Sequence, residues 1–147
     1  QPRTIGSQMW NEVALGLKQR TKALNLFIDD IYNSQNILRD GIVPTTVVLD
    51  SPNFKTACSG FTPPYKAWAN ICGTDLVRDE TGRFLVLEDN LRVPSGVSYM
   101  LENRETMLQM FPELFSQIRV RPVQDYPTRL ARSLAACWSL ASTSSES

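Results

Sequence analysis

Apolar residues recur at intervals of three and four positions along the first part of the chain, and most charged residues fall between them. The recurring residues are Met9, Val13, Leu17, Leu24, Phe27, Ile28 and Ile31. This spacing predicts one long helix over residues 7–34, for which Ser7 is a suitable N-cap. The helix should end near residues 33–36, and Asp40-Gly41 predicts a turn beyond it.

The next apolar run, Val43–Leu49, is short and directly follows that turn. A strand and a helical turn behind Pro44 both fit it, and the pattern does not separate them. The stretch Ser51–Lys66 contains three prolines and a glycine, and we expect a loop that crosses the surface.

Two β-type runs occupy the middle of the chain. They are Ala67–Val77 and Arg83–Glu88, and the polar segment 78–82, which contains Gly82, joins them. This arrangement predicts an antiparallel hairpin with a glycine-containing turn.

The remaining residues alternate between loops and helices. Asp89–Ser98 is expected to be a loop, and Ser95 or Ser98 could cap a helix that continues to about Met110. Pro112 should interrupt that helix. Further elements are predicted at the following positions: a short helical turn at Phe111–Phe115, an extended piece at Val120–Val123, and a last helix from Tyr126 to about Leu140.

Together these elements predict an α+β fold: a long N-terminal helix, a central antiparallel hairpin and C-terminal helices. We expect residues 1–140 to form a single domain and residues 141–147, which are rich in serine, to form a disordered tail. The first residue is not methionine, so we also expect the chain to derive from a longer protein.

Composition narrows the possible functions. The 147 residues include 15 basic and 15 acidic side chains, so net charge gives no reason to expect a nucleic acid or a membrane surface as partner. No apolar run approaches the roughly 20 residues of a membrane span. The sequence has no histidine, which excludes Ser-His-Asp and Cys-His catalysis within this chain and disfavours zinc.

The cysteines indicate the redox compartment of the protein rather than a disulfide or metal site. Cys58, Cys72 and Cys137 are odd in number and form no CxxC pair, which argues against a disulfide framework and against a zinc site. We expect free thiols in a reducing cytoplasm.

Three oxygen-bearing side chains on the predicted hairpin are candidates for metal binding. Asp75 lies on the first strand, Glu88 at the end of the second, and Asn90 two residues later. Period-two geometry places Glu88 and Asn90 on one face, and an antiparallel partner can bring Asp75 beside them. Such hard oxygen ligands suit Mg²⁺ bound together with substrate phosphates. The alternative is that all three are solvated residues at the end of a strand.

The segment after the hairpin offers a second candidate site. Arg92, Ser95 and Gly96 lie in a loop of small residues before a predicted helix, where the backbone can approach an anion. A plain capped helix is the alternative. Among other basic residues, Arg78 and Arg104 are further candidates, and a solvated helix face is the alternative for Arg104. We expect Lys18 and Arg20 to be solvated on the first helix.

Several of these segments carry a family resemblance. The run GTDLVRDETGRFLVLEDNLRVPSGVSYMLENR, residues 73–104, closely resembles the signature of circularly permuted ATP-grasp proteins. The run GLKQRTKALNLFIDDIYNSQNILRDGIVP, residues 16–44, and the FPELF and VRPVQDYP segments resemble the same family. The resemblance extends to about residue 134. These proteins are in turn similar to glutathionylspermidine synthetase.

This resemblance implies ATP-dependent ligation of a carboxylate to an amine, with ATP and Mg²⁺ as cofactors and a peptide or amino-acid-like carboxylate as substrate. Asp75, Glu88 and Asn90 match the family's Mg²⁺ ligands. Further, Pro94, Ser95 and Gly96 match its small residues, so that Ser95 and Gly96 would face the phosphates.

The sequence departs from the synthetase pattern in two ways. An arginine stands two residues before the aspartate in that pattern, where this chain has Gly73, and Arg78 or Arg92 would have to supply the charge as catalytic residues. Family members are also several times longer, so we expect the remainder of the ATP-grasp chain to be a necessary partner and these residues alone to be inactive.

Two alternative hypotheses for the function remain. One is a binding module that keeps the fold without catalysis. The other is an assembly subunit whose first helix docks a partner through the apolar face of residues 9–31.

Overall fold

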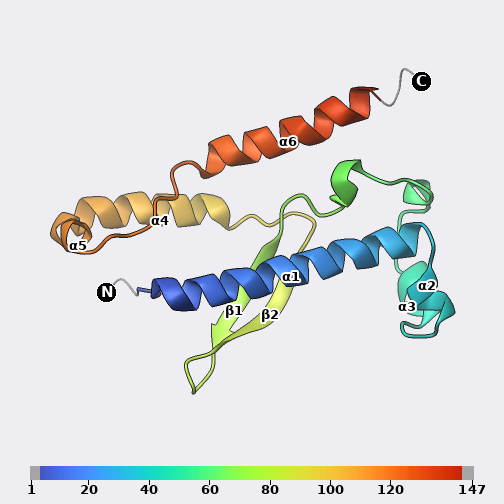
Figure 1. The fold of residues 1–147 in the computed structure, drawn as a ribbon, viewed down its shortest axis with the longest axis horizontal. Coiled ribbons are helices and arrows are strands. Elements are labelled where there is room, and N and C mark those ends of the chain that lie inside the picture. The colour runs from blue at the N-terminus through green and yellow to red at the C-terminus, as the bar shows by residue number, and fades with distance from the viewer. Residues whose placement is uncertain (1–3, 144–147) are drawn as a thin grey trace.

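The structure of the protein is a computed structural model that describes the backbone of residues 4–143 and the side chains of residues 4–137. It confirms an α+β fold with a long N-terminal helix, a two-stranded antiparallel sheet and C-terminal helices (Figure 1). The helices are α1 (Ser7–Tyr32), α2 (Asn36–Arg39), α3 (Thr45–Leu49), α4 (Val97–Met110), α5 (Pro112–Gln117) and α6 (Tyr126–Thr143), and the strands are β1 (Gly73–Arg78) and β2 (Phe84–Asn90).

Helix α1 crosses one face of the hairpin (Figure 1). The prediction of Ser7 as its N-cap was wrong, because Ser7 is already helical and the extended Gly6 precedes it without a side-chain cap. The helix ends two residues earlier than predicted, where the Asn33 side chain turns back to donate a 3.0 Å hydrogen bond to the carbonyl of Asp29. No helix within residues 4–143 is both long and apolar enough to cross a membrane.

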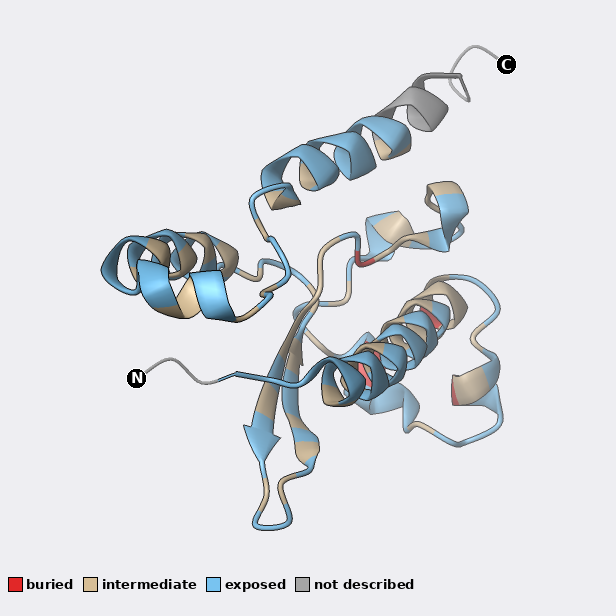
Figure 2. Ribbon diagram, turned by 60° about the vertical axis from the view of Figure 1, so that its left-hand side comes forward, coloured by how far each residue is buried: buried red, intermediate tan, exposed pale blue. Residues whose placement is uncertain are grey.

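A small core lies at the C-terminal end of α1. Ile31, Leu38 and Val48, one each from α1, α2 and α3, are buried against one another. Of the two interpretations for Val43–Leu49, the helical one is confirmed by α3. Figure 2 shows how few positions in the described chain are buried, and most of the surface elsewhere is exposed or intermediate.

An aromatic stack extends this core toward the hairpin. The Tyr32 ring at the end of α1 lies between those of Phe54 and Trp68, with centroid distances of 4.9 and 5.0 Å. Both partners come from the long segment between α3 and β1, which contains the two 3₁₀ turns Thr56–Cys58 and Pro64–Lys66. The stack therefore fixes a segment that has little other regular structure to the end of α1.

The hairpin is shorter at its start and longer at its end than predicted. Residues 67–72 are not a strand, since β1 begins only at Gly73. Asp89 and Asn90, which were expected in a loop, belong to β2 and pair with Thr74 and Gly73. A β-bulge between Asp75 and Leu76 leaves Leu87 of β2 without a partner in the register.

The C-terminal half differs from the prediction at its boundaries. Helix α4 is preceded by Gly96 without a side-chain cap, so neither Ser95 nor Ser98 caps it. Residues 120–123 form no strand. Helix α6 continues to Thr143, so residues 141–143 are helical where a tail was predicted, and residues 144–147 of that tail lie outside the described residues.

Candidate functional site

The β-bulge decides which side chains of β2 face α1 and which face away. Phe84 and Val86 are half-buried and line the space beneath α1. Strict alternation from Phe84 would turn Glu88 to that side as well. Because the bulge inserts Leu87, Asp89 faces α1 instead, whereas Glu88 and Asn90 are exposed on the opposite face.

The three predicted metal ligands meet on this opposite face. Asp75 and Glu88 are directly paired across the strands, which places their Cβ atoms roughly 5 Å apart. Asn90 follows on the same face, and its Nδ2 donates a 3.1 Å hydrogen bond to Oε1 of Glu88. The structure therefore brings together two carboxylates and one amide from the ends of both strands.

The chemistry of this donor set fits a hard divalent cation. Two like charges placed directly opposite each other destabilise a strand pair unless something compensates them. Within the described residues neither Asp75 nor Glu88 has an ion-pair partner. No cluster of three Asp, Glu, Cys or His side chains occurs in this part of the chain, so a third donor would have to be the amide oxygen of Asn90.

The loop after β2 folds back over the start of β1. A Cβ atom built on Gly73 would lie 2.7 Å from the Cβ of Pro94 and 3.7 Å from that of Asn90. Pro94 thus lies against the same face that carries the three donors. This close approach explains why position 73 is glycine, since an arginine at this position would displace the loop.

The same loop leads directly into helix α4. Ser95 and Gly96 are exposed, and the first amides of α4 have no side-chain cap. Amides at a helix start of this kind attract anions. A hollow of about 400 Å³ begins at Gly96 and follows one side of the helix, lined by Tyr99, Met100, Asn103, Arg104 and Met107.

The predicted catalytic arginines occupy different places. Arg92 is exposed in the loop, two residues beyond Asn90. Arg78 pairs with Phe84 near the hairpin turn, roughly 10 Å along the strand from Asp75. Its guanidinium lies 5.0 Å from the centre of the Phe84 ring and contacts the sulfur of Met9, so it faces α1. The structure brings Arg92, but not Arg78, to the end of the hairpin that carries the donors.

The sequence did not predict an ion pair on the α1 side of the hairpin, opposite the face that carries Asp75, Glu88 and Asn90. Arg20 is exposed, as expected, but its Nε also lies 2.6 Å from Oδ2 of Asp89, and Thr74 donates a 2.9 Å hydrogen bond to Oδ1 of the same carboxylate. The Asp89 side chain is only 10% exposed. The acidic residue Asp89 between Glu88 and Asn90 could have been noted in the sequence. The face of the hairpin to which its side chain points depends on the bulge.

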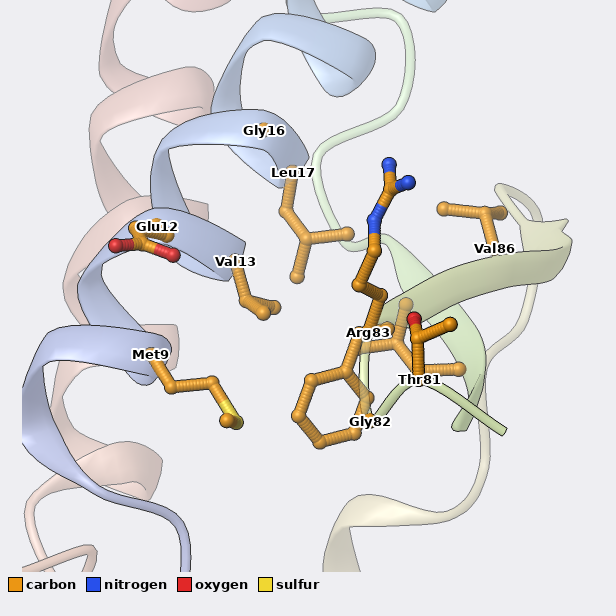
Figure 3. Close-up of a pocket in the computed structure, with 11 residues that line it drawn as sticks. Met9, Glu12, Val13, Gly16, Leu17, Thr81, Gly82, Arg83 and Val86 are labelled. Carbon is orange, nitrogen blue, oxygen red and sulfur yellow. The ribbon is translucent and has the colours of Figure 1, made fainter. Parts of the chain in front are cut away.

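A separate cavity of about 450 Å³ lies between α1 and the hairpin (Figure 3). In Figure 3 Met9, Val13 and Leu17 of α1 point toward the hairpin, and Arg83 and Thr81 border the space on the other side. This cavity is on the face of the hairpin away from the donors and is mostly apolar. It reflects loose packing of α1 near the hairpin turn and has no convergent ligand set.

The three cysteines are free, as expected. Burial raises the pKa of the Cys72 thiol, so this group is a poor nucleophile at neutral pH.

Comparisons with known proteins identify relatives over nearly the whole chain. The sequence model of the family described as circularly permuted ATP-grasp type 2 matches residues 2–147. An uncharacterized protein of Synechocystis sp. is 52% identical over 133 residues, which cover 90% of this chain and 28% of that protein. An uncharacterized protein of Mycobacterium tuberculosis is 48% identical over 90% of this chain and 24% of its own length.

One further relative has a functional name. A Frankia casuarinae protein that carries the provisional name glutamate–cysteine ligase 2-2 is 38% identical over 142 residues, 97% of this chain and 16% of that protein. The chain thus spans about a quarter of the length of the first two relatives and less of the third.

Proposed function

Because this chain belongs to the circularly permuted ATP-grasp type 2 family, we propose that it supplies the Mg²⁺ and phosphate-binding hairpin of an ATP-dependent carboxylate–amine ligase. The observation that carries the proposal is the meeting of Asp75, Glu88 and Asn90 on one exposed face of the hairpin. Two facing carboxylates without a cationic partner favour a bound divalent ion over a purely structural role.

Each group at the open end of the hairpin has a role in this proposal. Asp75, Glu88 and the amide oxygen of Asn90 hold Mg²⁺, which would neutralise phosphate charge when bound. Ser95 and Gly96 allow the backbone at the start of α4 to approach the phosphates. Arg92 supplies positive charge to the phosphates or to the substrate carboxylate.

Arg78 is the second candidate for the arginine that supplies this positive charge. Its guanidinium faces α1 and contacts Phe84 and Met9, so it would have to turn to the other side of the hairpin to reach the donors.

The proposed reaction has two steps. A carboxylate oxygen of the substrate attacks the γ-phosphorus of ATP, the bond to ADP breaks, and an acyl phosphate forms. The amine nitrogen then attacks the acyl carbon, phosphate leaves, and the nitrogen loses a proton to give the amide. The groups of this chain act by binding and orienting the phosphates.

The substrate class follows from relatives and remains a proposal. The name glutamate–cysteine ligase, carried by the Frankia casuarinae relative, is consistent with an amino-acid carboxylate and an amino-acid amine. Since this chain spans 16–28% of the three relatives described above, we assign the complete activity to a longer protein that contains it. The free cysteines support a reducing cytoplasm as its compartment.

The alternative of an assembly subunit finds little support in the packing of α1. Its apolar face is already engaged within the chain: Met9, Val13 and Leu17 face the hairpin, and Phe27 and Ile31 belong to the core. A non-catalytic binding module would keep the same hairpin, so only activity separates it from a ligase.

The direct test is ADP formation by the full-length protein with Mg²⁺, ATP and the proteinogenic amino acids as carboxylates and amines. Replacement of Glu88 by Gln should lower turnover by more than about 100-fold, because it removes one of the two carboxylate charges from the proposed metal site. Glu80→Gln, which removes the same charge from the exposed hairpin turn, is the matched control and should retain turnover. Equal turnover in Glu88→Gln and wild type would exclude the proposed site, and absence of turnover in wild type would favour the binding module.

A further inference from the structure

Asp89 lies between two proposed ligands but points away from both. Its carboxylate accepts hydrogen bonds from Arg20 of α1 at 2.6 Å and from Thr74 of β1 at 2.9 Å. Both oxygens are therefore occupied on the α1 side, and the side chain is 10% exposed. Despite its position in the Glu-Asp-Asn run, Asp89 is not available as a ligand on the outer face.

The bonding of Asp89 determines the direction of its neighbours. Adjacent strand residues point to opposite faces, so an Asp89 held toward α1 sends Glu88 and Asn90 outward. The bulge at Leu87 lies just before them, and a bulge is where a strand can re-aim its side chains. A slip of one residue at this point would turn both donors toward α1.

Arg20 contributes more than a surface charge in this arrangement. Helix α1 is the only element described here that lies across this face of the hairpin and carries an ion pair to it. The pair joins residues 69 positions apart in sequence, and the apolar contacts between α1 and the hairpin lie toward the other end, near Phe84. Arg20 is thus the polar contact that fixes the donor end of the hairpin.

We propose that Arg20 is a positioning residue for the metal site, acting through Asp89 to hold Glu88 and Asn90 on the outer face. This inference rests on the proposed function, because it presupposes that these residues bind Mg²⁺. Partners that orient metal ligands from behind commonly change metal affinity by 10- to 100-fold when they are removed.

The chain contains a matched ion pair that separates positioning from stability. Lys66 and Asp29 also join α1 to a distant segment, at 2.8 Å, with side-chain exposures of 59% and 13% against 46% and 10% for Arg20 and Asp89. Asp29 lies near the C-terminal end of α1, whereas Arg20 lies near its middle, so this second pair is away from the metal-ligand candidates. Lys66→Gln should therefore cost similar stability without affecting the metal site.

The experiment titrates Mn²⁺ into the full-length protein with ATP present, follows free Mn²⁺ by electron paramagnetic resonance against a protein-free titration at the same ATP concentration, and measures thermal unfolding in parallel. Arg20→Gln should weaken Mn²⁺ binding about tenfold, whereas Lys66→Gln should leave it unchanged. Arg20→Gln should have a smaller effect in Glu88→Gln than in wild type, because the charge of one of the two residues that Arg20 positions is already lost. Asp89→Asn, which keeps an acceptor for Thr74, replaces Arg20→Gln if that variant does not fold.

The outcomes distinguish this inference from the function on which it rests. If Glu88→Gln loses Mn²⁺ affinity while Arg20→Gln and Asp89→Asn match wild type, the positioning role is overturned and the metal site stands. If Arg20→Gln and Lys66→Gln weaken binding equally, the effect is general destabilisation and the inference is also overturned. If wild type binds no Mn²⁺ or Glu88→Gln binds it normally, both proposals fall.

Discussion

At the scale of single residues, the absence of a side chain at Gly73 shapes the candidate site. Its backbone needs no positive φ, so its small size is what matters. The space that a side chain would need is filled by Pro94, which lies beside Asn90. The residue that departs from the synthetase pattern is therefore the one that lets the loop containing Pro94 rest against the face that carries Asn90.

Gly73→Ala should lower the free energy of unfolding by about 1–3 kcal/mol, because its Cβ would overlap Pro94 and the loop would have to move. Gly16→Ala is the matched control: Gly16 lies within α1 with open space around it, and the same change should stabilise by about 0.5–1 kcal/mol. Urea unfolding measures both. Equal effects of the two substitutions would contradict the close approach of Pro94.

Asp30 of α1 makes a pH-dependent contribution to stability through hydrogen bonds that its carboxylate accepts at the start of α2. The backbone amide of Ile37, and then that of Asn36, donate to its carboxylate and hold its pKa below the usual value. A folded-state pKa below the unfolded value of about 3.9 means that the stabilisation is present above that pH and is lost as the pH falls through the folded pKa.

Wild type should therefore lose stability below about pH 4 more steeply than Asp30→Asn, which has no titrating group at this position. Urea midpoints between neutral and strongly acidic pH measure the slope. Asp50→Asn, which removes an exposed carboxylate after α3, controls for the loss of one charge. Parallel curves for wild type and Asp30→Asn would contradict this role.

At the scale of elements, the sequence predicted those with a strong local signal. The three- and four-residue spacing in α1 and the polar turn in the hairpin gave the right elements in the right order. The sequence pattern did not predict the bulge. The position of an extra residue in a strand is set by pairing with the partner strand, and it leaves no periodic pattern in the sequence. Helix caps were also mispredicted, since glycine precedes both α1 and α4 where serine seemed available.

The aromatic stack at the end of α1 is one of the contacts that hold the irregular segment 51–72, together with the Lys66–Asp29 ion pair. Replacing Tyr32 by Ala should lower the free energy of unfolding by about 3 kcal/mol, since its ring packs between Phe54 and Trp68. Tyr32→Phe keeps the ring and loses only the hydroxyl that accepts from the Lys55 amide, and should cost about 1 kcal/mol. Urea unfolding separates the two, and similar losses would show that the stack contributes little.

At the scale of the whole molecule, the chain buries little for its length. Among the described residues four apolar side chains are buried, and Val77, Leu85 and Leu87 are exposed on the donor face of the hairpin. A two-stranded sheet needs packing on its faces for stability. The relatives contain much additional sequence, and we expect that sequence to cover this face and complete the site.

Part of the candidate site could be predicted from sequence, because it depends on the local geometry of a strand. Residues 88 and 90 share a face in any regular strand, so Glu88 and Asn90 could be paired from sequence, and the hairpin turn brought Asp75 opposite. The link from Arg20 to Asp89 spans 69 residues and depends on how α1 lies on the sheet. Local patterns do not contain that information, so the position of Arg20 required the structure.

The measurement that tests the central claim most directly is Mn²⁺ binding by the full-length protein, with and without ATP, in wild type and in Glu88→Gln. We predict that ATP strengthens Mn²⁺ binding in wild type, because carboxylates and phosphates share the ion, and that Glu88→Gln loses this gain while Glu80→Gln retains it. Mn²⁺ binding in Glu88→Gln as tight as in wild type, with the same response to ATP, would contradict the account.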